Sequence, residues 1–349
     1  MSGKEWWRPD VFASRADNLA ARGKALTAIR TFFAERGFAE VETPCLQISP
    51  GMEPHLKAFT TRLADAYGGP DLELALHTSP EFAMKKLLVA GVPRLYQLAR
   101  VFRNAERSPT HHPEFTMLEW YRAGAGLEQV MDDTEALVRA CAHATGATEL
   151  RRDGLGCDPF QPWRRLSVAE AFFEYGGIDI LATAPSPLDP DRDRLAAEAG
   201  RIGISVSISD RWDDIFFKIM LDRIEPILGV DRPVILHSYP LSMAALARPS
   251  PNDPRVAERF EAYALGVELA NAFGELTDSA EQRRRFEADM ALKLALYGES
   301  HPVDEDFLAA LDYGMPESSG IALGFDRLVM LLTGAETIDQ VLWAPVACG

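Results

Sequence analysis

Arginine, histidine and aromatic residues gather in one short stretch of the chain. Arg103 ends one predicted strand and Phe115 begins the next, so we expect the two strands to pair as a hairpin with a long loop. An arginine fork can hold a phosphate through two parallel hydrogen bonds, and a phenylalanine across from it offers a flat face to a base. His111 and His112 lie in the loop, where they would meet terminal phosphates. The alternative is a surface hairpin that carries a solvated arginine and two turn histidines.

Two glutamates, Glu268 and Glu275, stand seven residues apart in a largely apolar stretch. An odd separation places two side chains on opposite faces of a regular strand. The glutamates converge only if a bend or bulge intervenes, which Gly274 permits. Two converging carboxylates would bind Mg²⁺ or an ammonium group. The alternative is a pair of unrelated, exposed glutamates.

A glycine-bounded strand, Ser319–Gly324, is predicted to run directly into a helix over Asp326–Leu332. Gly324 at the end of the strand lets a ligand approach the backbone closely. Arg327, in the first helical turn, points back toward that strand end. The alternative is an ordinary strand–helix turn in which Arg327 pairs with Asp326 or with solvent.

The elements that must position these residues are helices and short strands. Asp17–Arg36 has the apolar spacing of a helix and is followed by Gly37. A strand over Phe38–Thr43 is stopped by Pro44, and Ser279 is predicted to cap a later helix. The other predicted elements are the strands Leu72–Leu76, Leu95–Phe102, Phe115–Tyr121 and Val234–His237, antiparallel strands within Phe260–Leu276, and the helices Ser79–Ala90, Glu128–Ala144, Ser279–Leu296 and Asp304–Leu311. This mixture predicts the α+β class.

Composition narrows the functional class. The 349 residues include 36 Lys+Arg and 52 Asp+Glu, which gives a formal net charge of −16. This balance argues against a protein that holds nucleic acid through its overall field. The four cysteines are scattered, without a CxxC pair, which argues against a disulfide scaffold or a structural zinc site. No apolar run approaches the roughly 20 residues of a membrane helix, and the N-terminus lacks the apolar core of a signal peptide. We therefore expect a cytoplasmic protein that binds no membrane.

The motifs, in their order along the chain, resemble those of class II aminoacyl-tRNA synthetases. Gly37–Pro44 resembles motif 1, the dimer-forming segment that ends in proline, Phe102–Glu119 resembles motif 2, and Gly324–Arg327 resembles motif 3. The likeness is sharper to the lysyl branch, and the residues that carry it are Phe102-Arg103-Asn104, His111, Pro113-Glu114-Phe115-Thr116, Glu268 to Glu275, and Thr277-Asp278.

The chain departs from a lysyl-tRNA synthetase before the first motif. Fewer than twenty residues precede the first long helix, so we expect no anticodon-binding domain. A short, acidic, lysyl-type core resembles the family of elongation factor P β-lysine ligases. That family has Ala at the position of Ala322, where lysyl-tRNA synthetases have Gly.

The resemblance implies a fold and an activity. The fold is the class II catalytic fold, an antiparallel sheet flanked by helices, over residues 17–349 after an N-terminal extension 1–16. The implied homodimer activates (R)-β-lysine with ATP and Mg²⁺ as an adenylate and transfers it to a lysine side chain of elongation factor P, without stable tRNA binding. The alternatives are a truncated enzyme that charges tRNA with lysine and a non-catalytic regulatory paralogue.

The resemblance also implies roles for individual residues. Arg103 and Arg327, the catalytic arginines, hold phosphates, and Phe115 stacks on adenine. The implied ATP-binding residues are Arg103, Asn104, Ala105, His111, His112, Phe115, Glu268, Leu269, Gly324 and Arg327. The implied amino-acid pocket consists of Ser79, Pro80, Glu81, Tyr121, Asn271, Glu275 and Ala322. Glu268 and Glu275 are the implied metal ligands, and Glu275 is equally open to the substrate ε-ammonium.

Three positions depart from the lysyl pattern. Ala105 stands where a glutamate is expected, His112 stands in place of asparagine, and Ala272 stands in place of glycine. Glu106 follows Ala105, so either Glu106 substitutes through a small shift of the loop or the contact is lost.

Overall fold

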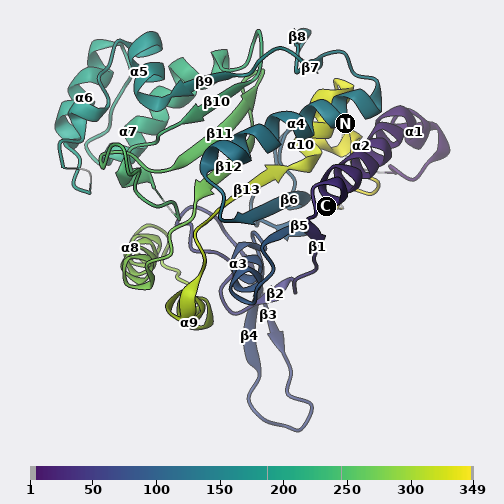
Figure 1. Ribbon diagram of the computed structural model, residues 1–349, viewed down its shortest axis with the longest axis horizontal. Coiled ribbons are helices and arrows are strands. Elements are labelled where there is room, and N and C mark those ends of the chain that lie inside the picture. The colour runs from purple at the N-terminus through teal and green to yellow at the C-terminus, as the bar shows by residue number, and fades with distance from the viewer. Residues whose placement is uncertain (1–4, 187, 245, 347–349) are drawn as a thin grey trace.

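The centre of the fold is an eight-stranded sheet (Figure 1). The computed structural model describes residues 5–186, 188–244 and 246–346. The strands of the sheet are β1 Ala39–Glu40, β5 Arg94–Phe102, β6 Glu114–Ala123, β9 Arg164–Ser167, β10 Val234–His237, β11 Arg259–Ala264, β12 Val267–Gly274 and β13 Ser318–Gly324. Their order is β1-β5-β6-β13-β12-β11-β10-β9. Neighbours are antiparallel except at the edges, where β1 pairs with β5 and β9 pairs with β10 in parallel.

Helices and two smaller sheets surround this sheet. The helices are α1 Pro9–Ala13, α2 Ala16–Glu35, α3 Glu81–Val89, α4 Leu127–Thr145, α5 Val168–Gly176, α6 Arg192–Arg201, α7 Trp212–Ile219, α8 Ser279–Tyr297, α9 Glu305–Gly314 and α10 Phe325–Thr333. Short helical turns are η1 Leu181–Thr183, η2 Met220–Ile224, η3 Glu225–Ile227, η4 Leu241–Met243 and η5 Ile338–Gln340. The smaller sheets consist of β2 Leu46–Gln47, β3 Phe59–Leu63 and β4 Leu72–Leu76, and of β7 Leu150–Arg152 and β8 Leu155–Cys157.

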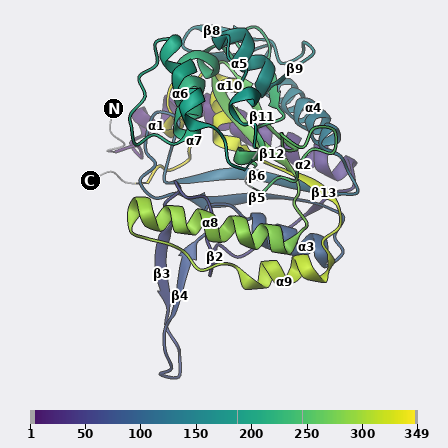
Figure 2. The ribbon, with the colours of Figure 1, turned by 90° about the vertical axis from the view of Figure 1, so that its left-hand side faces the viewer.

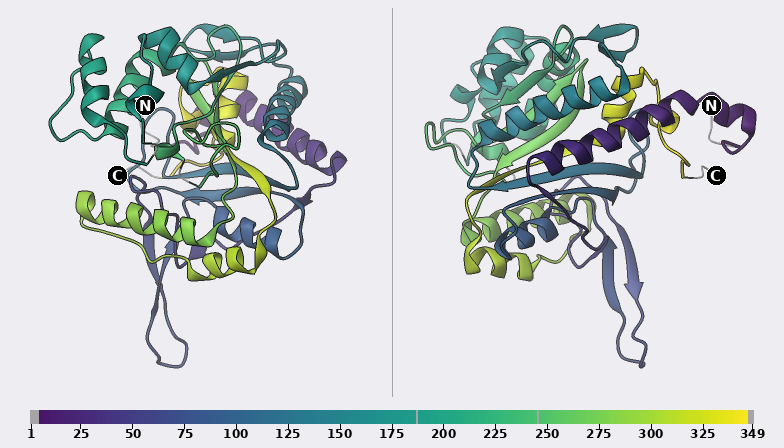
Figure 3. Two further views of the ribbon diagram at one scale, coloured as in Figure 1. Left: turned by 60° about the vertical axis from the view of Figure 1, so that its left-hand side comes forward. Right: turned by 45° about the vertical axis from the view of Figure 1, so that its right-hand side comes forward.

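The two faces of the large sheet have different environments because side chains alternate along each strand. Leu118 and Trp120 of β6 belong to the main hydrophobic core with side chains of α2, α4 and α10, which lie along one face (Figure 3). Leu95 and Tyr121 point to the other face, where they pack with side chains of α3, α8 and α9. These three helices cover only part of that face, so a portion of the sheet remains open to a ligand.

Two further parts of the chain extend from this body. The helices α5, α6 and α7 share a second hydrophobic core, in which Phe216 stacks on Phe172 and Trp212 (Figure 2). The β3–β4 hairpin projects away from the rest of the protein (Figures 1 and 2). The extension predicted over residues 1–16 contains α1, and residues 1–4 lie outside the described part.

Most predicted elements are confirmed, including the α+β class and the antiparallel hairpin β5–β6. Two details are wrong. Asp278 caps α8 instead of Ser279, because its carboxylate accepts the backbone N–H of Glu281 at 2.9 Å. The strand predicted over Phe38–Thr43 is shortened to Ala39–Glu40, because only these two residues pair with β5.

Two expectations about thiols and membranes concern the whole chain. Among the described residues, Cys45, Cys141 and Cys157 are free, and Cys348 lies outside the described part. Within the same described ranges, none of the helices has the length and apolarity that crossing a bilayer requires.

A buried ion pair joins three of these elements. Arg22 of α2 pairs with Asp326 at the start of α10, and their side chains are only 4% and 1% exposed. Asp326 also accepts the backbone N–H of Thr116 in β6 at 2.6 Å, while Arg22 donates to the Thr116 hydroxyl at 3.0 Å. The Arg22 guanidinium lies 4.7 Å from the centre of the Phe325 ring. This cluster fixes α2, β6 and α10 relative to one another.

Removing one partner of this pair tests its importance. The D326N substitution leaves the Arg22 charge buried without its counter-ion, which costs about 3–5 kcal/mol in comparable sites. We expect urea denaturation to show a loss of that size in the free energy of unfolding, and the double variant R22M/D326N to recover part of it. The matched control is E198Q, which breaks the exposed Arg201–Glu198 pair and should cost less than about 1 kcal/mol. A D326N loss no larger than that of the control would contradict the assigned role.

Candidate active site

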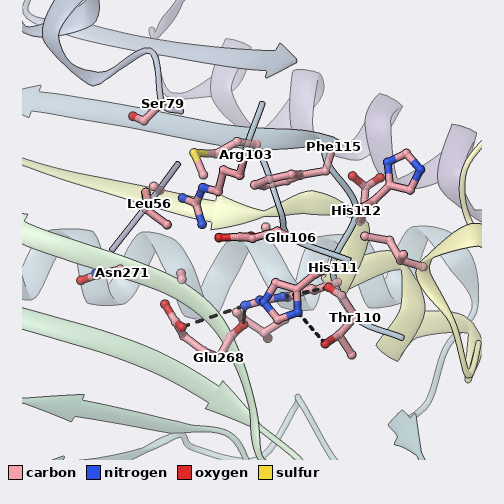
Figure 4. Close-up of a pocket in the computed structure, with 18 of the residues that line it drawn as sticks. Leu56, Ser79, Arg103, Glu106, Thr110, His111, His112, Phe115, Glu268 and Asn271 are labelled. Carbon is pink, nitrogen blue, oxygen red and sulfur yellow. Dashed lines mark hydrogen bonds and ion pairs between the residues drawn. The ribbon is translucent and has the colours of Figure 1, made fainter. Parts of the chain in front are cut away.

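A cavity of about 350 Å³ lies on the open part of the sheet (Figure 4). Its floor is built by strand alternation, which places cross-strand neighbours of β6, β13 and β12 in one row. Glu119 pairs with Ala322, and Ala322 pairs in turn with Asn271. Phe115 and Met117 of β6 point to the same face as Glu119 and also line the cavity.

The structure brings together most of the residues predicted to form a site. The predicted residues that line the cavity are Ser79, Glu81, Arg103, His111, His112, Phe115, Glu268, Leu269, Asn271, Ala322, Gly324 and Arg327. The predicted residues outside this lining are Pro80, Asn104, Ala105, Tyr121 and Glu275. Lining residues that the sequence did not indicate include Glu53, Leu56, Thr110, Met117, Ala270, Phe273 and Ile338.

A β-bulge places Glu268 and Glu275 on the same face of β12. Two consecutive residues of β11 pair with Ala270 and Glu268, so Leu269 is the extra residue between them. An extra residue reverses the alternation of side chains, and the odd spacing no longer separates the two glutamates. The two glutamates thus share a face, as a bulge would allow, but the irregularity lies at Leu269 and not at Gly274. A Cβ atom on Gly274 would lie 2.3 Å from a carboxylate oxygen of Glu258, so the glycine leaves space for the Glu258 side chain.

The two glutamates nevertheless lie far apart. Seven residues of extended strand span roughly 20 Å, whereas Mg²⁺ binds its oxygen ligands at about 2 Å. One Mg²⁺ ion therefore cannot contact both carboxylates, and their shared metal site is ruled out. Glu268 lies 4.0 Å from Arg327, and Glu275 lies 2.6 Å from the ammonium of Lys85. The cavity has an arginine end, formed by Arg103, His111, Glu268 and Arg327. Its carboxylate end is lined by Ser79 and Glu81, and these two contact a buried cluster that consists of Lys85, Glu119, Tyr121 and Glu275.

Arg327 organises the arginine end. Its guanidinium donates to the backbone oxygen of Glu268 at 2.9 Å and to Nε2 of His111 at 2.7 Å. His111 therefore carries its proton on Nδ1, which faces the Ser108 hydroxyl at 2.7 Å. Burial and the nearby Arg327 charge lower the pKa of His111, so the imidazole is neutral. The pairing of Arg327 with Asp326 is not observed, because Asp326 is held in the buried pair described above.

Arg103 and Phe115 face each other as the hairpin predicts. The Arg103 guanidinium lies 5.3 Å from the centre of the Phe115 ring, and both side chains point into the cavity (Figure 4). The buried Nε atom of Arg103 has no hydrogen-bond partner within the described residues. Buried donors are almost always paired in native proteins, so an anion entering the cavity would complete this site.

The loop after Arg103 places Glu106, and not Ala105, in the cavity. Ala105 has a φ of +64°, and its N–H donates to the Asn104 side chain at 2.8 Å. Glu106 lines the cavity instead, with its carboxylate directed inward (Figure 4). The carboxylate that is missing at position 105 is thus replaced in the cavity by that of Glu106.

His112 is held by neighbouring backbone groups. Its Nδ1 atom lies 2.5 Å from the carbonyl oxygen of Glu114, and Nε2 accepts the backbone N–H of Val346 at 3.1 Å. The residue is only 2% exposed. Both ring nitrogens are therefore engaged, and a hydrogen bond from this ring to a nucleotide does not fit. His112 instead holds the C-terminal segment against the loop.

Three carboxylates and one ammonium meet at the carboxylate end. Lys85 forms ion pairs with Glu275 and, through a short contact, with Glu81. Glu119 accepts the Ser79 hydroxyl at 2.6 Å and the Tyr121 hydroxyl at 2.9 Å. Glu119, Glu275 and Lys85 are each about 1% exposed. The cluster is an anionic, water-excluded site that suits a ligand with ammonium groups.

Glu119 and Lys85 were missed in the sequence, although both left a signal. Glu119 follows Phe115 by four residues on the same predicted strand, so the two share a face. Lys85 follows Glu81 by four residues on a predicted helix, which is the spacing of a side-chain ion pair. A search for residues on the same face as each predicted site residue would have found both.

Burial changes the protonation of these carboxyl groups. Burial and the nearby Glu81 raise the pKa of Glu119 to about 8. Burial also raises the pKa of Glu275 to about 7, although the Lys85 charge opposes it. The pKa of Lys85 is raised, because Glu275 and Glu81 outweigh the effect of burial. At neutral pH the free cluster thus holds protons that a cationic ligand would displace.

Among the described residues of the cavity, those of the arginine end fit a metal ion. No group of three or more His, Cys, Asp or Glu side chains within the described ranges is placed to hold a metal. Mg²⁺ commonly uses one or two carboxylates together with substrate phosphates. Glu268 is 40% exposed, and it faces the cavity beside Arg327. Its carboxylate fits such an ion, provided that phosphates supply further ligands.

Comparison with known proteins agrees with this geometry. A family model described as tRNA synthetases class II (D, K and N) matches residues 11–347. The elongation factor P–(R)-β-lysine ligase of Proteus mirabilis is 40% identical over 342 residues, which cover 97% of each chain. The protein of the same name from Hamiltonella defensa is 39% identical over 348 residues, which cover 99% of each chain.

The raised pKa of Glu119 predicts a pH-dependent stability. In the unfolded chain a glutamate titrates near about 4.3, so between that value and about 8 only the folded state keeps the proton. The free energy of unfolding therefore falls as the pH rises. We expect the difference between the wild type and E119Q to fall by about 1 kcal/mol per pH unit from pH 5 to 7, as measured by urea denaturation. A difference that is independent of pH would show that Glu119 is ionised in the folded protein.

Proposed function

Because the chain belongs to the class II tRNA synthetase family of the D, K and N group, we propose that it is an ATP-dependent ligase that joins (R)-β-lysine to a lysine side chain of elongation factor P. The two relatives carry that activity in their names and match this chain over nearly their whole lengths. The observation that carries the proposal is a single cavity with an arginine end and a carboxylate end on one face of the sheet. A nucleotide and a diamino acid fit these two ends side by side.

The arginine end binds ATP in this proposal. Phe115 stacks on the adenine, Arg103 holds the α-phosphate and the substrate carboxylate, and Arg327 holds the γ-phosphate. Leu269 and Gly324 lie beside the nucleotide. Glu268 holds Mg²⁺, and the ion neutralises charge on the phosphates when it is bound. Fixed positive groups at these positions stabilise the negative charge that gathers on phosphorus as the carboxylate attacks.

The carboxylate end binds the amino acid. Glu275 and Tyr121 receive the ε-ammonium together with Glu119, and Ser79 and Glu81 lie near the second amine. Asn271 lines the cavity, and its side-chain N–H groups donate to the substrate carboxylate. Lys85 supplies one cation for three carboxylates, so a neutral side chain would leave buried carboxylate charge unpaired, and the site rejects monoamino acids.

The reaction has two steps. The (R)-β-lysine carboxylate attacks the α-phosphorus of ATP, so a carbon–oxygen–phosphorus linkage forms and pyrophosphate leaves. A neutral lysine amine of elongation factor P then attacks the carbonyl carbon of this anhydride, which forms an amide and expels AMP. The amine proton passes to water or to the AMP phosphate. Holding both reacting groups in the cavity supplies much of the acceleration.

The proposal extends to the organisation of the protein. We propose that residues 17–349 form one catalytic unit preceded by the extension 1–16, and that the protein acts in the cytoplasm without stable tRNA binding. We also propose a homodimer. Leu63 and Leu72 are paired in the β3–β4 hairpin, and both they and Leu46 of the same sheet are about half exposed. An apolar face of this kind beside motif 1 suits a second copy of the chain.

The proposed activity is tested by intact-mass measurement of elongation factor P after incubation with the protein, Mg-ATP and (R)-β-lysine, with α-lysine in parallel. We expect the mass to increase by one lysyl unit, faster with the β isomer, and only when ATP is present. Charging of lysine tRNA in place of elongation factor P would favour a tRNA-charging enzyme. An absence of ATP–pyrophosphate exchange with every lysine isomer would favour a regulatory paralogue.

Ala322 offers a test of substrate choice. Its methyl group lies on the cavity floor between Glu119 and Asn271. In A322G the floor gains the volume of one methyl group, a change worth about tenfold in discrimination between closely related substrates. We expect the ratio of kcat/KM for (R)-β-lysine over α-lysine to fall about tenfold. The control is A272G, the same change on the core side of β12, which should leave the ratio unchanged. An unchanged ratio in A322G would remove Ala322 from the specificity determinants.

A further inference from the structure

Lys85 is a fully buried lysine at the carboxylate end of the cavity, and neither step of the reaction uses it. Its side chain is 1% exposed, and its ammonium lies between Glu275, at 2.6 Å, and Glu81. Glu81 lies one turn earlier on α3, whereas Glu275 directly follows β12. One ammonium therefore connects carboxylates from two separate elements.

The charges of the cluster can be counted from these contacts. Three carboxylates, those of Glu81, Glu119 and Glu275, face one ammonium, that of Lys85. When all four are ionised, the cluster has a net charge of −2. A diamino acid brings two ammonium groups to this cavity. The net charge of these four groups is therefore equal in size and opposite in sign to the charge of the two ammonium groups.

The two carboxylate oxygens of Glu275 have different surroundings. Its Oε2 lies 2.6 Å from the Lys85 ammonium in an ion pair. Neither buried oxygen of this carboxylate has a hydrogen-bond partner within the described residues, so the ion pair alone distinguishes Oε2 from Oε1. A Cβ atom on Gly320 would lie 2.6 Å from Oε1 and 2.2 Å from the Tyr121 ring. Gly320 thus leaves room for Oε1 and Tyr121 to approach each other, and Oε1 is the atom left for a ligand.

We propose that Lys85 is a positioning residue that holds Glu81 and Glu275 apart and leaves one oxygen of Glu275 for the substrate ammonium. The inference rests on the proposed function, since it assumes a diamino acid in the cavity. It goes beyond that function because it assigns a role to Lys85, which contacts the carboxylates that bind the substrate and does not contact the reacting atoms. Without Lys85, three buried carboxylates would face one another with no internal cation, and they would bind protons or rearrange.

Simple attraction predicts the opposite result. If only the total charge mattered, removal of Lys85 would make the cavity more negative and would tighten the binding of a cation. If Lys85 sets the geometry, its removal weakens binding of the amino acid and leaves ATP unaffected. The direction of the change in KM therefore separates the two mechanisms.

The test compares three variants in the full-length protein by ATP–pyrophosphate exchange. K85M removes the ammonium and keeps the stem, and K85R restores a positive charge. K86M is the matched control, because Lys86 neighbours Lys85 on α3 but pairs with Asp304 and Asp306 outside the cavity. We expect K85M to raise the KM for (R)-β-lysine roughly tenfold with the KM for ATP unchanged, K85R to recover part of this loss, and K86M to resemble the wild type.

The pH profile adds a readout that a purely structural role would not move. The groups that face the Lys85 ammonium are Glu81 of α3, Glu119 and Tyr121 of β6, and Glu275, with Arg248 beyond Glu275. Loss of the Lys85 charge raises the pKa of the facing carboxyl groups. The acid limb of kcat/KM for (R)-β-lysine should therefore move to higher pH in K85M and remain in place in K86M.

The possible results are distinguishable. An unchanged or lower KM for (R)-β-lysine in K85M, with an unmoved acid limb, overturns the role of Lys85 and leaves the proposed function intact. A parallel loss of kcat and of thermal stability without a change in either KM also overturns it, because that result describes a structural lysine. An absence of exchange by the wild type with all lysine isomers overturns the proposed function and this inference together.

Discussion

The buried pair between Arg22 and Asp326 is the contact on which the geometry of the site depends. It joins helix α2, strand β6 and helix α10 through two charged side chains and the backbone of Thr116. These elements carry Arg327 of the arginine end and Phe115, which lines the same cavity. Because both charges are desolvated, neither α2 nor α10 can move away without leaving an unpaired charge in the core. Arg327 is therefore held on a rigid frame, whereas Arg103 and His111 of the arginine end lie in the loop between β5 and β6.

The cavity exists because one face of the sheet is covered unevenly. Helices α2, α4 and α10 cover the other face completely enough to form the main core, while α3, α8 and α9 cover only one end of the site face. Alternation along β6, β12 and β13 then presents every second side chain to the open part. Helix α3 borders the cavity and carries Glu81 and Lys85. The same helix therefore bounds the cavity and supplies two of the charged side chains at its carboxylate end.

The chemistry of the cavity follows from the contrast between its ends. The arginine end offers donors and a neutral histidine, which suit phosphates. The carboxylate end offers buried acids whose protonation depends on whether a cation is present. Two of the three departures from the lysyl pattern concern this cavity, and the third, Ala272, lies in the main core. Glu106 provides a carboxylate in the cavity in place of the one missing at position 105. His112 accepts a hydrogen bond from the backbone of the C-terminal segment.

The sequence alone determined the fold class, the hairpin that joins Arg103 to Phe115, and the turn that carries Arg327, because these depend on local periodicity and on short motifs. It could not place the irregularity at Leu269, since a bulge is defined by pairing with β11 and not by the residues of β12. It could not separate the roles of Glu268 and Glu275, because their distance along a strand matters only once their partners are known. The positions of Lys85 and His112 depend on contacts between residues far apart in the chain. Lys85 pairs with Glu275, and His112 accepts a hydrogen bond from Val346. Only tertiary packing decides such contacts, because burial fixes which charges must be paired.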